Sequence, residues 1–245
     1  MKFLRFFVDG EVLNGVVSGD CVKETGAPRR EFRLDAVKIL PPVVPSKIVC
    51  VGLNYRDHAL ELGMAVPDEP VLFIKPSTAV IGPSEAIIYP RSAGRVDYEA
   101  ELGVVIKCVA KDILPGKAVD HIAGYTCVND VTARDIQKKD VQWTRAKSFD
   151  TFAPIGPWIE TELDIADLRV RSYLNGALKQ DSGTAEFIFD IPRLVSFISS
   201  VMTLLPGDII ATGTPPGVGP MEPGDEIAIE VQGIGRLVNR VERQS

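Results

Sequence analysis

Short apolar stretches separated by glycine, proline, asparagine and aspartate make up most of this chain. A short stretch that is rich in β-branched and aromatic side chains and bounded by such breakers is typical of a β-strand. After residue 46 the stretches that meet this description are residues 47–51, 71–74, 86–89, 98–108, 122–128, 168–174, 208–211, 226–231 and 235–241. Their close succession predicts a β-rich domain.

Two turn signals predict hairpins. Residues 2–8 and 11–17 flank Asp9-Gly10, and the stretch 168–174 ends at Asn175-Gly176. Asp-Gly and Asn-Gly readily adopt the positive φ angles that a two-residue hairpin turn requires.

A proline-rich stretch over residues 40–45 stiffens the chain and marks a boundary. We therefore expect a small N-terminal β region and linker over residues 1–45. A larger domain over residues 46–245 carries all the candidate functional residues.

Three segments predict helices: residues 55–62, 131–138 and 191–203. The first ends at Gly63, a natural residue for the left-handed position after a helix, and the second follows Asp130. The third has a proline in its first turn and an apolar stripe at helical spacing, which consists of Leu194, Val195, Ile198, Val201 and Met202. Such a stripe packs against a core and needs no ligand.

Composition narrows the class of protein. The chain has 245 residues, of which 45% are apolar and 24% charged, as in ordinary globular proteins. Its net charge of −6 argues against binding nucleic acid through bulk electrostatics. No apolar run is long enough to span a membrane, and the apolar start gives way to Asp9-Gly10 too early for a signal peptide. We therefore expect a cytoplasmic protein.

The cysteines predict no disulfide framework. They show no C-x-x-C spacing and lie in or beside apolar segments, which predicts reduced and mostly buried thiols at Cys21, Cys50, Cys108 and Cys127. A catalytic cysteine is the lesser alternative, because neither histidine is near one in the sequence.

Three acidic residues form the strongest chemical signal. Glu99 and Glu101 lie two residues apart in a predicted strand, so their side chains point the same way, and Asp130 ends a later strand. Three carboxylates suit a hard divalent cation such as Mg²⁺ or Mn²⁺. Two alternatives remain at this point: a solvated strand face for the glutamates, and an N-cap for Asp130. The apolar run after Glu101 favours burial, and buried carboxylates need a charge partner or a metal.

A histidine and a glutamate form the second signal. His58 and Glu61 lie three residues apart on the first predicted helix, close enough for an imidazole–carboxylate contact. Such a pair can activate water as a general base at neutral pH. The alternative is an exposed helix with an incidental charge pattern.

Weaker signals surround these two. Lys75 is a basic residue at the end of an apolar strand, which makes it a candidate for a substrate contact. Arg134 and Gln137 lie one turn apart after Asp130, so they could meet one ligand. The glycine-rich segment 212–219 has no P-loop lysine, but it could bring backbone N–H groups and the Thr214 hydroxyl near a carboxylate. A tight turn between strands is the alternative.

Five motifs occur in an order that resembles the fumarylacetoacetate hydrolase family: residues 52–58, 97–102, 129–135, 147–150 and 213–219. The similarity covers residues 46–242 and is greatest to the smaller acylpyruvase, oxaloacetate decarboxylase and 2-hydroxyhepta-2,4-diene-1,7-dioate isomerase members. The resemblance implies a mixed, β-rich α+β fold of the β-roll type, with a few short helices and a small N-terminal β region. It also implies a homodimer.

The same resemblance implies roles for the candidate residues. It implies that Mg²⁺ or Mn²⁺ is bound by Glu99, Glu101 and Asp130, and that His58 and Glu61 belong to a lid that closes on the substrate. Lys147 would reach the metal site and pair with the substrate carboxylate or the developing enolate; the alternative is a free lysine on an exposed turn. Among the remaining candidates, the resemblance favours Gln137 for a substrate contact, whereas Arg134 has a structural alternative.

The function that follows is metal-dependent chemistry on a small 2-oxo or 2,4-dioxo acid that passes through an enolate. We expect hydrolysis of the C–C bond of an acylpyruvate of the fumarylpyruvate type. The alternatives are decarboxylation or tautomerisation of oxaloacetate, and isomerisation of 2-hydroxyhepta-2,4-diene-1,7-dioate. A non-catalytic metal and carboxylate-binding module is a further alternative, against which the intact His58, Glu61 and Lys147 argue.

Overall fold

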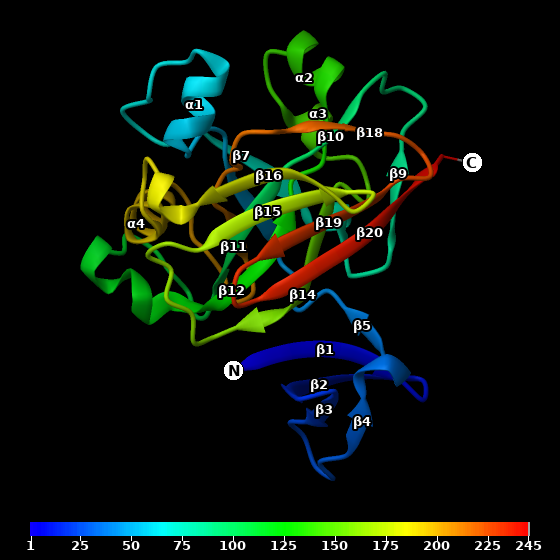
Figure 1. Ribbon diagram of the computed structural model, residues 1–245. Helices are drawn as coiled ribbons and strands as arrows, with labels where there is room; N and C mark the ends of the chain where they lie inside the picture. The colour runs from blue at the N-terminus through cyan, green and yellow to red at the C-terminus, as the bar shows by residue number, and fades with distance from the viewer. Residues whose placement is uncertain (245) are drawn as a thin grey trace.

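The computed structural model describes residues 1–244, and most of this chain forms β-strands in three sheets (Figure 1). The largest sheet has 12 strands. Its members are β1 (Lys2–Val8), β2 (Glu11–Ser18), β3 (Cys21–Glu24), β4 (Glu31–Arg33), β5 (Lys38–Leu40), β6 (Lys47–Val51), β7 (Leu72–Pro76), β8 (Val80–Ile81), β11 (Ala100–Ile106), β12 (Ile122–Asn129), β14 (Ala153–Glu160) and β17 (Ile209–Ala211). Its main path runs β4-β3-β2-β1-β14-β12-β11-β17-β6-β7, with β5 paired to β1 and β8 paired to β14.

Two smaller sheets complete the β structure. The five-stranded sheet has the order β16 (Ala177–Gly183), β15 (Arg169–Leu174), β19 (Glu226–Val231), β20 (Gly235–Arg243) and β9 (Ala86–Tyr89). The three-stranded sheet has the order β13 (Thr132–Ala133), β10 (Val96–Tyr98) and β18 (Gly219–Met221). The expected β-rich fold of the β-roll type with few helices is confirmed, and the large sheet and the five-stranded sheet pack on each other through the main apolar core.

The central strand of the large sheet is completely buried. β11 lies between β12 and β17, and all seven of its residues are buried, because both faces of a central strand are covered. This burial includes the side chain of Glu101, so the alternative of a solvated strand face is wrong.

The helices are short. They are α1 (Arg56–Leu62), α2 (Arg134–Lys139), α3 (Thr144–Lys147) and α4 (Ile191–Val201), with 3₁₀ turns at Leu34–Ala36, Ser77–Ala79, Pro115–His121 and Thr184–Glu186. The predicted core helix is confirmed as α4, where the Asp190 side chain accepts a hydrogen bond from the Arg193 N–H at the first turn. α1 ends at Gly63 with a φ of 62°, as expected. Among residues 1–244, no helix is long and apolar enough to cross a membrane.

The second helix begins later than predicted. Residues 132–133 pair with Val96 and Asp97 in the three-stranded sheet, and α2 starts only at Arg134. The N-cap is Ala133, which makes no capping bond, so Asp130 is not an N-cap. Thr132 is β-branched and lies beside β10, so it favours an extended strand over a helical turn.

One long strand was expected at residues 98–108, but the chain changes sheets at Glu99. β10 belongs to the three-stranded sheet, whereas β11 begins at Ala100 in the large sheet. A second difference is β14, which the sequence did not predict. Pro154, Gly156 and Pro157 interrupt its apolar pattern, and such residues usually argue against a central strand.

The first 45 residues form the lower lobe in Figure 1. The hairpin of β1 and β2 is confirmed, and Leu4, Phe6 and Val22 form a core of their own. β1 nevertheless continues the large sheet, because Lys2 pairs with Glu160 of β14. The first 45 residues thus have a small core of their own and share the large sheet with the rest of the chain.

The cysteines are all free, but only Cys50 and Cys127 are buried. Cys108 is exposed, and its Sγ lies 3.3 Å from Nδ1 of His121. The expectation of mostly buried thiols is therefore wrong for Cys108. His121 ends a 3₁₀ turn directly before β12.

Candidate active site

The three acidic residues converge where β10, β11 and β12 meet. Ala100 of β11 pairs with Asn129 of β12. Glu99 and Glu101 lie on either side of Ala100 in the chain, and Asp130 directly follows Asn129. The backbone N–H of Asp130 donates to the Glu99 carbonyl at 3.0 Å. All three side chains are buried, and one ligand oxygen from each lies within 4.8 Å of the others.

Of the three carboxylates, only Glu101 forms no ion pair with a basic side chain in the described chain. Its Oε2 accepts a hydrogen bond from the Gly213 N–H at 2.8 Å, and no lysine, arginine or histidine in the described chain forms an ion pair with it. Burial raises the pKa of Glu101 well above its usual value, and the neighbouring Asp130 and Glu99 carboxylates raise it further. A buried carboxylate in this position is stabilised by a bound cation.

Glu99 is in the opposite situation. It lies 3.0 Å from Lys147 Nζ and also forms an ion pair with Arg134. Burial alone would raise the pKa of Glu99, but Lys147 and Arg134 outweigh this effect and hold it at about 2. Glu99 is therefore ionised throughout the physiological pH range.

Two buried lysines contact Asp130 from different sides. Lys147 Nζ lies 2.5 Å from Asp130 Oδ2, and Lys75 Nζ lies 2.5 Å from Asp130 Oδ1 and 2.9 Å from the Val131 carbonyl. Burial lowers the pKa of Lys75 despite the attraction of Asp130. For Lys147, Asp130 and Glu99 outweigh the effect of burial and raise the pKa. The alternative of a lysine on an exposed turn is wrong for Lys147, whose side chain is 2% exposed.

These residues fit a divalent metal ion. Three carboxylates supply hard oxygen ligands within reach of one cation, and Glu101 lacks a positive partner. Glu99, Glu101 and Asp130 are the residues that would hold it.

The histidine pair lies on α1. Nδ1 of His58 is 2.8 Å from Oε2 of Glu61, and the other oxygen of Glu61 accepts a hydrogen bond from the Gly217 N–H at 3.0 Å. His58 is 8% exposed, so the alternative of an exposed helix with an incidental charge pattern does not apply to it. Since Glu61 engages Nδ1, the remaining ring nitrogen, Nε2, is the one available to a ligand.

A cavity of about 420 Å³ joins the acidic cluster to the histidine pair. Its polar lining includes most of the sequence-predicted site, namely His58, Glu99, Arg134, Gln137, Lys147 and Thr214. Glu61, Glu101 and Asp130 do not line it but contact residues or segments that do. Lys75 does not line it either and contacts Asp130. The end of α1 and the segment after it supply apolar lining residues, namely Leu62, Met64, Ala65 and Pro67.

Arg134 is fixed by the protein itself. Its guanidinium donates to Asp97 at 2.9 Å and to Gln137 Oε1 at 2.6 Å, in addition to the contact with Glu99. These contacts support the structural alternative for Arg134.

Gln180 is a functional candidate that sequence reasoning missed. Its side chain is fully buried; its Oε1 accepts from the Ala100 N–H at 3.0 Å, and its Nε2 donates to Thr214 Oγ1 at 2.8 Å. Thr214 in turn donates to the Ala100 carbonyl at 2.9 Å. Gln180 therefore ties the glycine-rich segment to the residue between the two glutamates. Only the structure reveals this, because a glutamine in an exposed hairpin pattern carries no signal of such a contact.

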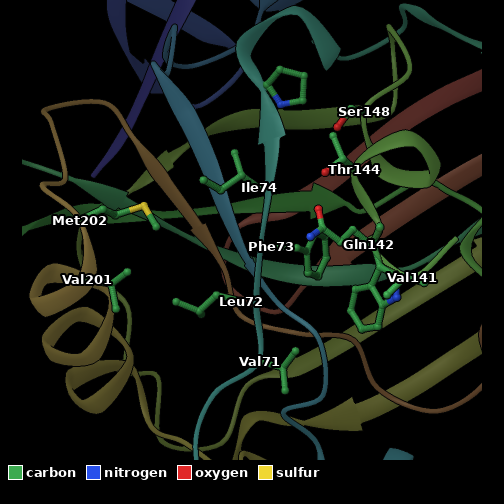
Figure 2. Close-up of a pocket in the computed structure, with 12 residues that line it drawn as sticks. Val71, Leu72, Phe73, Ile74, Val141, Gln142, Thr144, Ser148, Val201 and Met202 are labelled. Carbon is green, nitrogen blue, oxygen red and sulfur yellow. The ribbon is translucent and has the colours of Figure 1, made fainter.

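A second, more open groove of about 840 Å³ lies beside the cavity (Figure 2). In this view β7 runs through the middle, with Val201 and Met202 on one side and Val141, Gln142, Thr144 and Ser148 on the other. The groove shares Phe73 and Trp143 with the cavity, and these rings pack edge to face at 5.4 Å. It contains none of the predicted site residues, so the candidate site is the smaller cavity.

Comparison with known proteins identifies the family. The family model described as "Fumarylacetoacetate (FAA) hydrolase C-terminal" matches residues 47–242. The chain belongs to this family, and the resemblance seen in the sequence is confirmed. It is therefore an enzyme of a family whose members bind a divalent metal.

Three relatives show the range of the family. The chain is similar to the structure of 5-carboxymethyl-2-hydroxymuconate delta-isomerase from Mycobacterium smegmatis, with 46% identity, full coverage of both chains and a TM-score of 0.93. It is 43% identical to the mitochondrial oxaloacetate tautomerase FAHD2B of Bos taurus, over 97% of this chain and 79% of that protein. The maleylpyruvate hydrolase of Sphingobium sp. SYK-6, in a structure with manganese(II) and pyruvate, is 30% identical with a TM-score of 0.85 and full coverage of both chains.

Proposed function

We propose that this enzyme cleaves the C–C bond of acylpyruvates by adding water to the 4-carbonyl group, and that it requires Mg²⁺ or Mn²⁺. The observation that carries this proposal is the position of His58, which is held by Glu61 at 2.8 Å and faces the same cavity as Glu99 and Lys147. The base, His58, thus lines the same cavity as the residues that would bind the 2-oxo acid end of the substrate. Glu99, Glu101 and Asp130 would hold the metal ion.

The chain's own residues supply the acid–base steps. Nε2 of His58 accepts a proton from water, because Glu61 engages the other ring nitrogen and stabilises the imidazolium that forms. The hydroxide adds to C4, the C3–C4 bond breaks, and the electron pair passes to the pyruvate enolate. Lys147 stabilises the negative charge, and the proton that His58 took from water passes to C3, which completes pyruvate and restores the base. When bound, the metal ion supplies Lewis acidity at the 2-oxo acid group.

Other residues position the substrate in this proposal. Gln137 keeps its NH₂ group available to a ligand, since only its oxygen is engaged by Arg134. Thr214 lines the cavity while its hydroxyl bonds to Ala100 and Gln180, so we propose that it shapes the site. Lys75 does not line the cavity; we propose that it fixes Asp130 rather than the substrate.

A second candidate is tautomerisation of oxaloacetate or isomerisation of a 2-hydroxydiene-dioate. The similar proteins support this candidate. The chain is 43% identical to an oxaloacetate tautomerase and 46% identical to a delta-isomerase, but only 30% identical to the maleylpyruvate hydrolase. These reactions need a base that moves a proton at carbon and no added water, so the same His58 would serve both candidates.

A panel of substrates separates these candidates. Acylpyruvates, oxaloacetate and 2-hydroxydiene-dioates are each incubated with enzyme and Mn²⁺, and products are followed by proton NMR. Release of pyruvate and a carboxylic acid supports hydrolysis. Proton exchange at carbon or isomerisation without C–C cleavage favours the second candidate. If the enzyme turns over none of these 2-oxo acids, both candidates are wrong.

We also propose a cytoplasmic homodimer whose partner is a small 2-oxo acid and not a nucleic acid. The four free cysteines and the net charge of −6 support the location and the lack of affinity for nucleic acid. The many short strands, whose edges need covering, support the dimer.

A further inference from the structure

β16 is an edge strand of the five-stranded sheet, and its polar side chains alternate between exposed and buried positions (Figure 1). Lys179 and Asp181 are exposed, whereas Gln180 and Ser182 are buried. The two buried residues lie two positions apart in a strand, so their side chains point to the same face. A polar side chain is costly to bury unless it forms hydrogen bonds. The hydrogen bonds of Gln180 and Ser182 therefore indicate what this face of β16 holds in place.

Gln180 joins the glycine-rich segment, residues 212–219, to β11. Its NH₂ group donates to the Pro215 carbonyl at 2.8 Å, in addition to its bond to Thr214 Oγ1. Its oxygen accepts the Ala100 N–H at 3.0 Å. One fully buried side chain thus fixes the segment relative to the strand that carries the metal-ligand candidates.

The backbone of β16 also fits closely against this segment. The pairing with β15 shifts register, so that Lys179 has no partner on β15 and forms a β-bulge. A Cβ atom on Gly217 would lie 2.3 Å from the Lys179 carbonyl oxygen, so only glycine fits there. The backbone N–H groups of Gly213 and Gly217 hold Glu101 and Glu61. The position of the segment against β16 therefore affects both carboxylates.

Ser182 contacts the first turn of α1, the helix that carries His58. Its hydroxyl donates to Asp57 Oδ2 at 2.5 Å, and Asp57 Oδ1 accepts the backbone N–H of His58 at 2.9 Å. Asp57 thus links β16 to the backbone of His58. Through this link, β16 fixes the start of α1.

From these contacts we infer that Gln180 and Ser182 are positioning residues of the active site. Gln180 sets the metal site by holding the segment that binds Glu101. Ser182 sets the base by holding Asp57 and, with it, the backbone of His58. Neither Gln180 nor Ser182 lines the cavity, so each acts through another residue. The inference rests on the proposed function, in which Glu101 is a metal ligand and His58 is the base.

The test uses the full chain with one variant of each residue. Gln180→Met keeps about the length of the side chain but removes its hydrogen bonds, and Ser182→Ala removes only the hydroxyl. Ser172→Ala is a matched control, because Ser172 is a fully buried serine of the neighbouring strand β15. Its hydroxyl has no hydrogen-bond partner within residues 1–244. If Gln180→Met fails to fold, Gln180→Asn replaces it, since its shorter side chain cannot span the same partners.

The first measurement is the affinity of the metal-free protein for Mn²⁺, by isothermal titration calorimetry. We expect Gln180→Met to bind Mn²⁺ about 10–100-fold more weakly than wild type, the usual effect of losing a residue that orients a metal ligand. Ser182→Ala and Ser172→Ala should keep the wild-type affinity, because neither contacts the segment that binds Glu101.

The second measurement is the nitrogen-15 NMR spectrum of the imidazole rings. The chain has only two histidines, so His121 serves as an internal reference. Ser182→Ala should change the ring-nitrogen shifts of His58 and leave those of His121 unchanged. It should also lower kcat for acylpyruvate cleavage by about 10-fold, because the base is no longer held in place.

These outcomes separate the inference from the proposed function. Wild-type affinity for Mn²⁺ in the Gln180 variant, or unchanged His58 signals in Ser182→Ala, would overturn it. The same changes in Ser172→Ala would also overturn it, since they would reflect a general loosening of the sheet. If wild type cleaves no acylpyruvate, the proposed reaction is wrong, and the Mn²⁺ affinities and the His58 signals still decide the positioning roles. If wild type binds no Mn²⁺, the proposed metal site is wrong and the role of Gln180 falls with it.

Discussion

Glu61 Oε2 lies 2.8 Å from His58 Nδ1, while Glu61 Oε1 is held by the Gly217 N–H at 3.0 Å. One carboxylate thus connects the imidazole of α1 to the glycine-rich segment that also binds Glu101 through the Gly213 N–H. The base and the acidic cluster are linked by a single loop, although their residues lie far apart in the chain. This arrangement fixes which ring nitrogen of His58 faces the cavity.

The first prediction concerns the base. His58→Ala should lower kcat for acylpyruvate cleavage by about 10²–10⁴-fold, the usual contribution of a general base. Decarboxylation of oxaloacetate should fall less, because that reaction needs no activated water. Lys147→Ala should depress both activities, since both develop an enolate. Steady-state kinetics of the two reactions provide the measurement, and unchanged cleavage of every acylpyruvate by His58→Ala would show that water is activated elsewhere.

The second prediction concerns the orienting carboxylate. Glu61→Gln keeps the size of the side chain but removes the charge that stabilises the His58 imidazolium. We expect a loss of about 10–100-fold in kcat, because the imidazolium that forms when His58 takes a proton loses the charge that stabilises it. Steady-state kinetics of acylpyruvate cleavage measure this. An unchanged kcat would mean that the Glu61 charge plays no part in the reaction.

The acidic pair and the histidine pair were accessible from the sequence because each depends on local spacing. Glu99 and Glu101 are two residues apart, and His58 and Glu61 are one helical turn apart. Contacts that cross the fold were not accessible. Lys75 reaches Asp130 across 55 residues of chain, and Gln180 reaches Ala100 across 80, so both depend on strand order.

The same distinction applies to the fold. Strands that glycine or proline clearly delimits in the sequence, such as β6, β9 and β19, have the predicted bounds. The prolines and the glycine of β14 hid a strand that tertiary packing nevertheless keeps in the sheet between β1 and β12. The chain crosses between sheets at Glu99, where Glu99 N–H bonds to Asn129 Oδ1 rather than to a strand partner. No local pattern predicts that bond.

The third prediction uses the buried charge of Glu101. Mn²⁺ should raise the melting temperature of wild type, since a ligand that binds only the native state stabilises it. In the presence of a chelator, Glu101→Gln should be at least as stable as wild type, because it removes a buried carboxylate without a cation partner. Differential scanning calorimetry measures both effects. Equal stabilisation of wild type and Glu101→Gln by Mn²⁺ would exclude Glu101 as a ligand.

The fourth prediction concerns pH and stability away from the site. Burial would raise the pKa of Asp208, but hydrogen bonds from Lys47, the Leu205 N–H and Ser46 outweigh this and lower it. A carboxylate whose pKa is lower in the folded state stabilises the protein above its unfolded pKa, about 3.9, and that contribution is lost as the pH falls through the folded value. Asp208→Asn should therefore cost about 1–3 kcal/mol at pH 7 and progressively less below pH ~4.

Denaturant unfolding at several pH values checks this prediction. The exposed pair of Arg33 and Asp35 offers a control, because Asp35→Asn should change the free energy of unfolding little at any pH. A cost of Asp208→Asn that stays constant down to low pH would contradict the assignment.

The fifth prediction is the assembly. A homodimer has a mass of about 53 kDa, twice the 26.6 kDa of the chain. Light scattering at working concentration should give this value, because the family resemblance and the sheet edges both favour a symmetric pair. A mass near 26.6 kDa would refute it.

The central claim is that Glu99, Glu101 and Asp130 hold a divalent cation in the cavity that His58 faces. A crystal structure with Mn²⁺, recorded at the manganese absorption edge, tests this most directly. The account predicts an anomalous peak within ~2.0–2.6 Å of one oxygen of each carboxylate. Density that shows no ion there, with Lys147 and Arg134 still paired to these carboxylates, would contradict it.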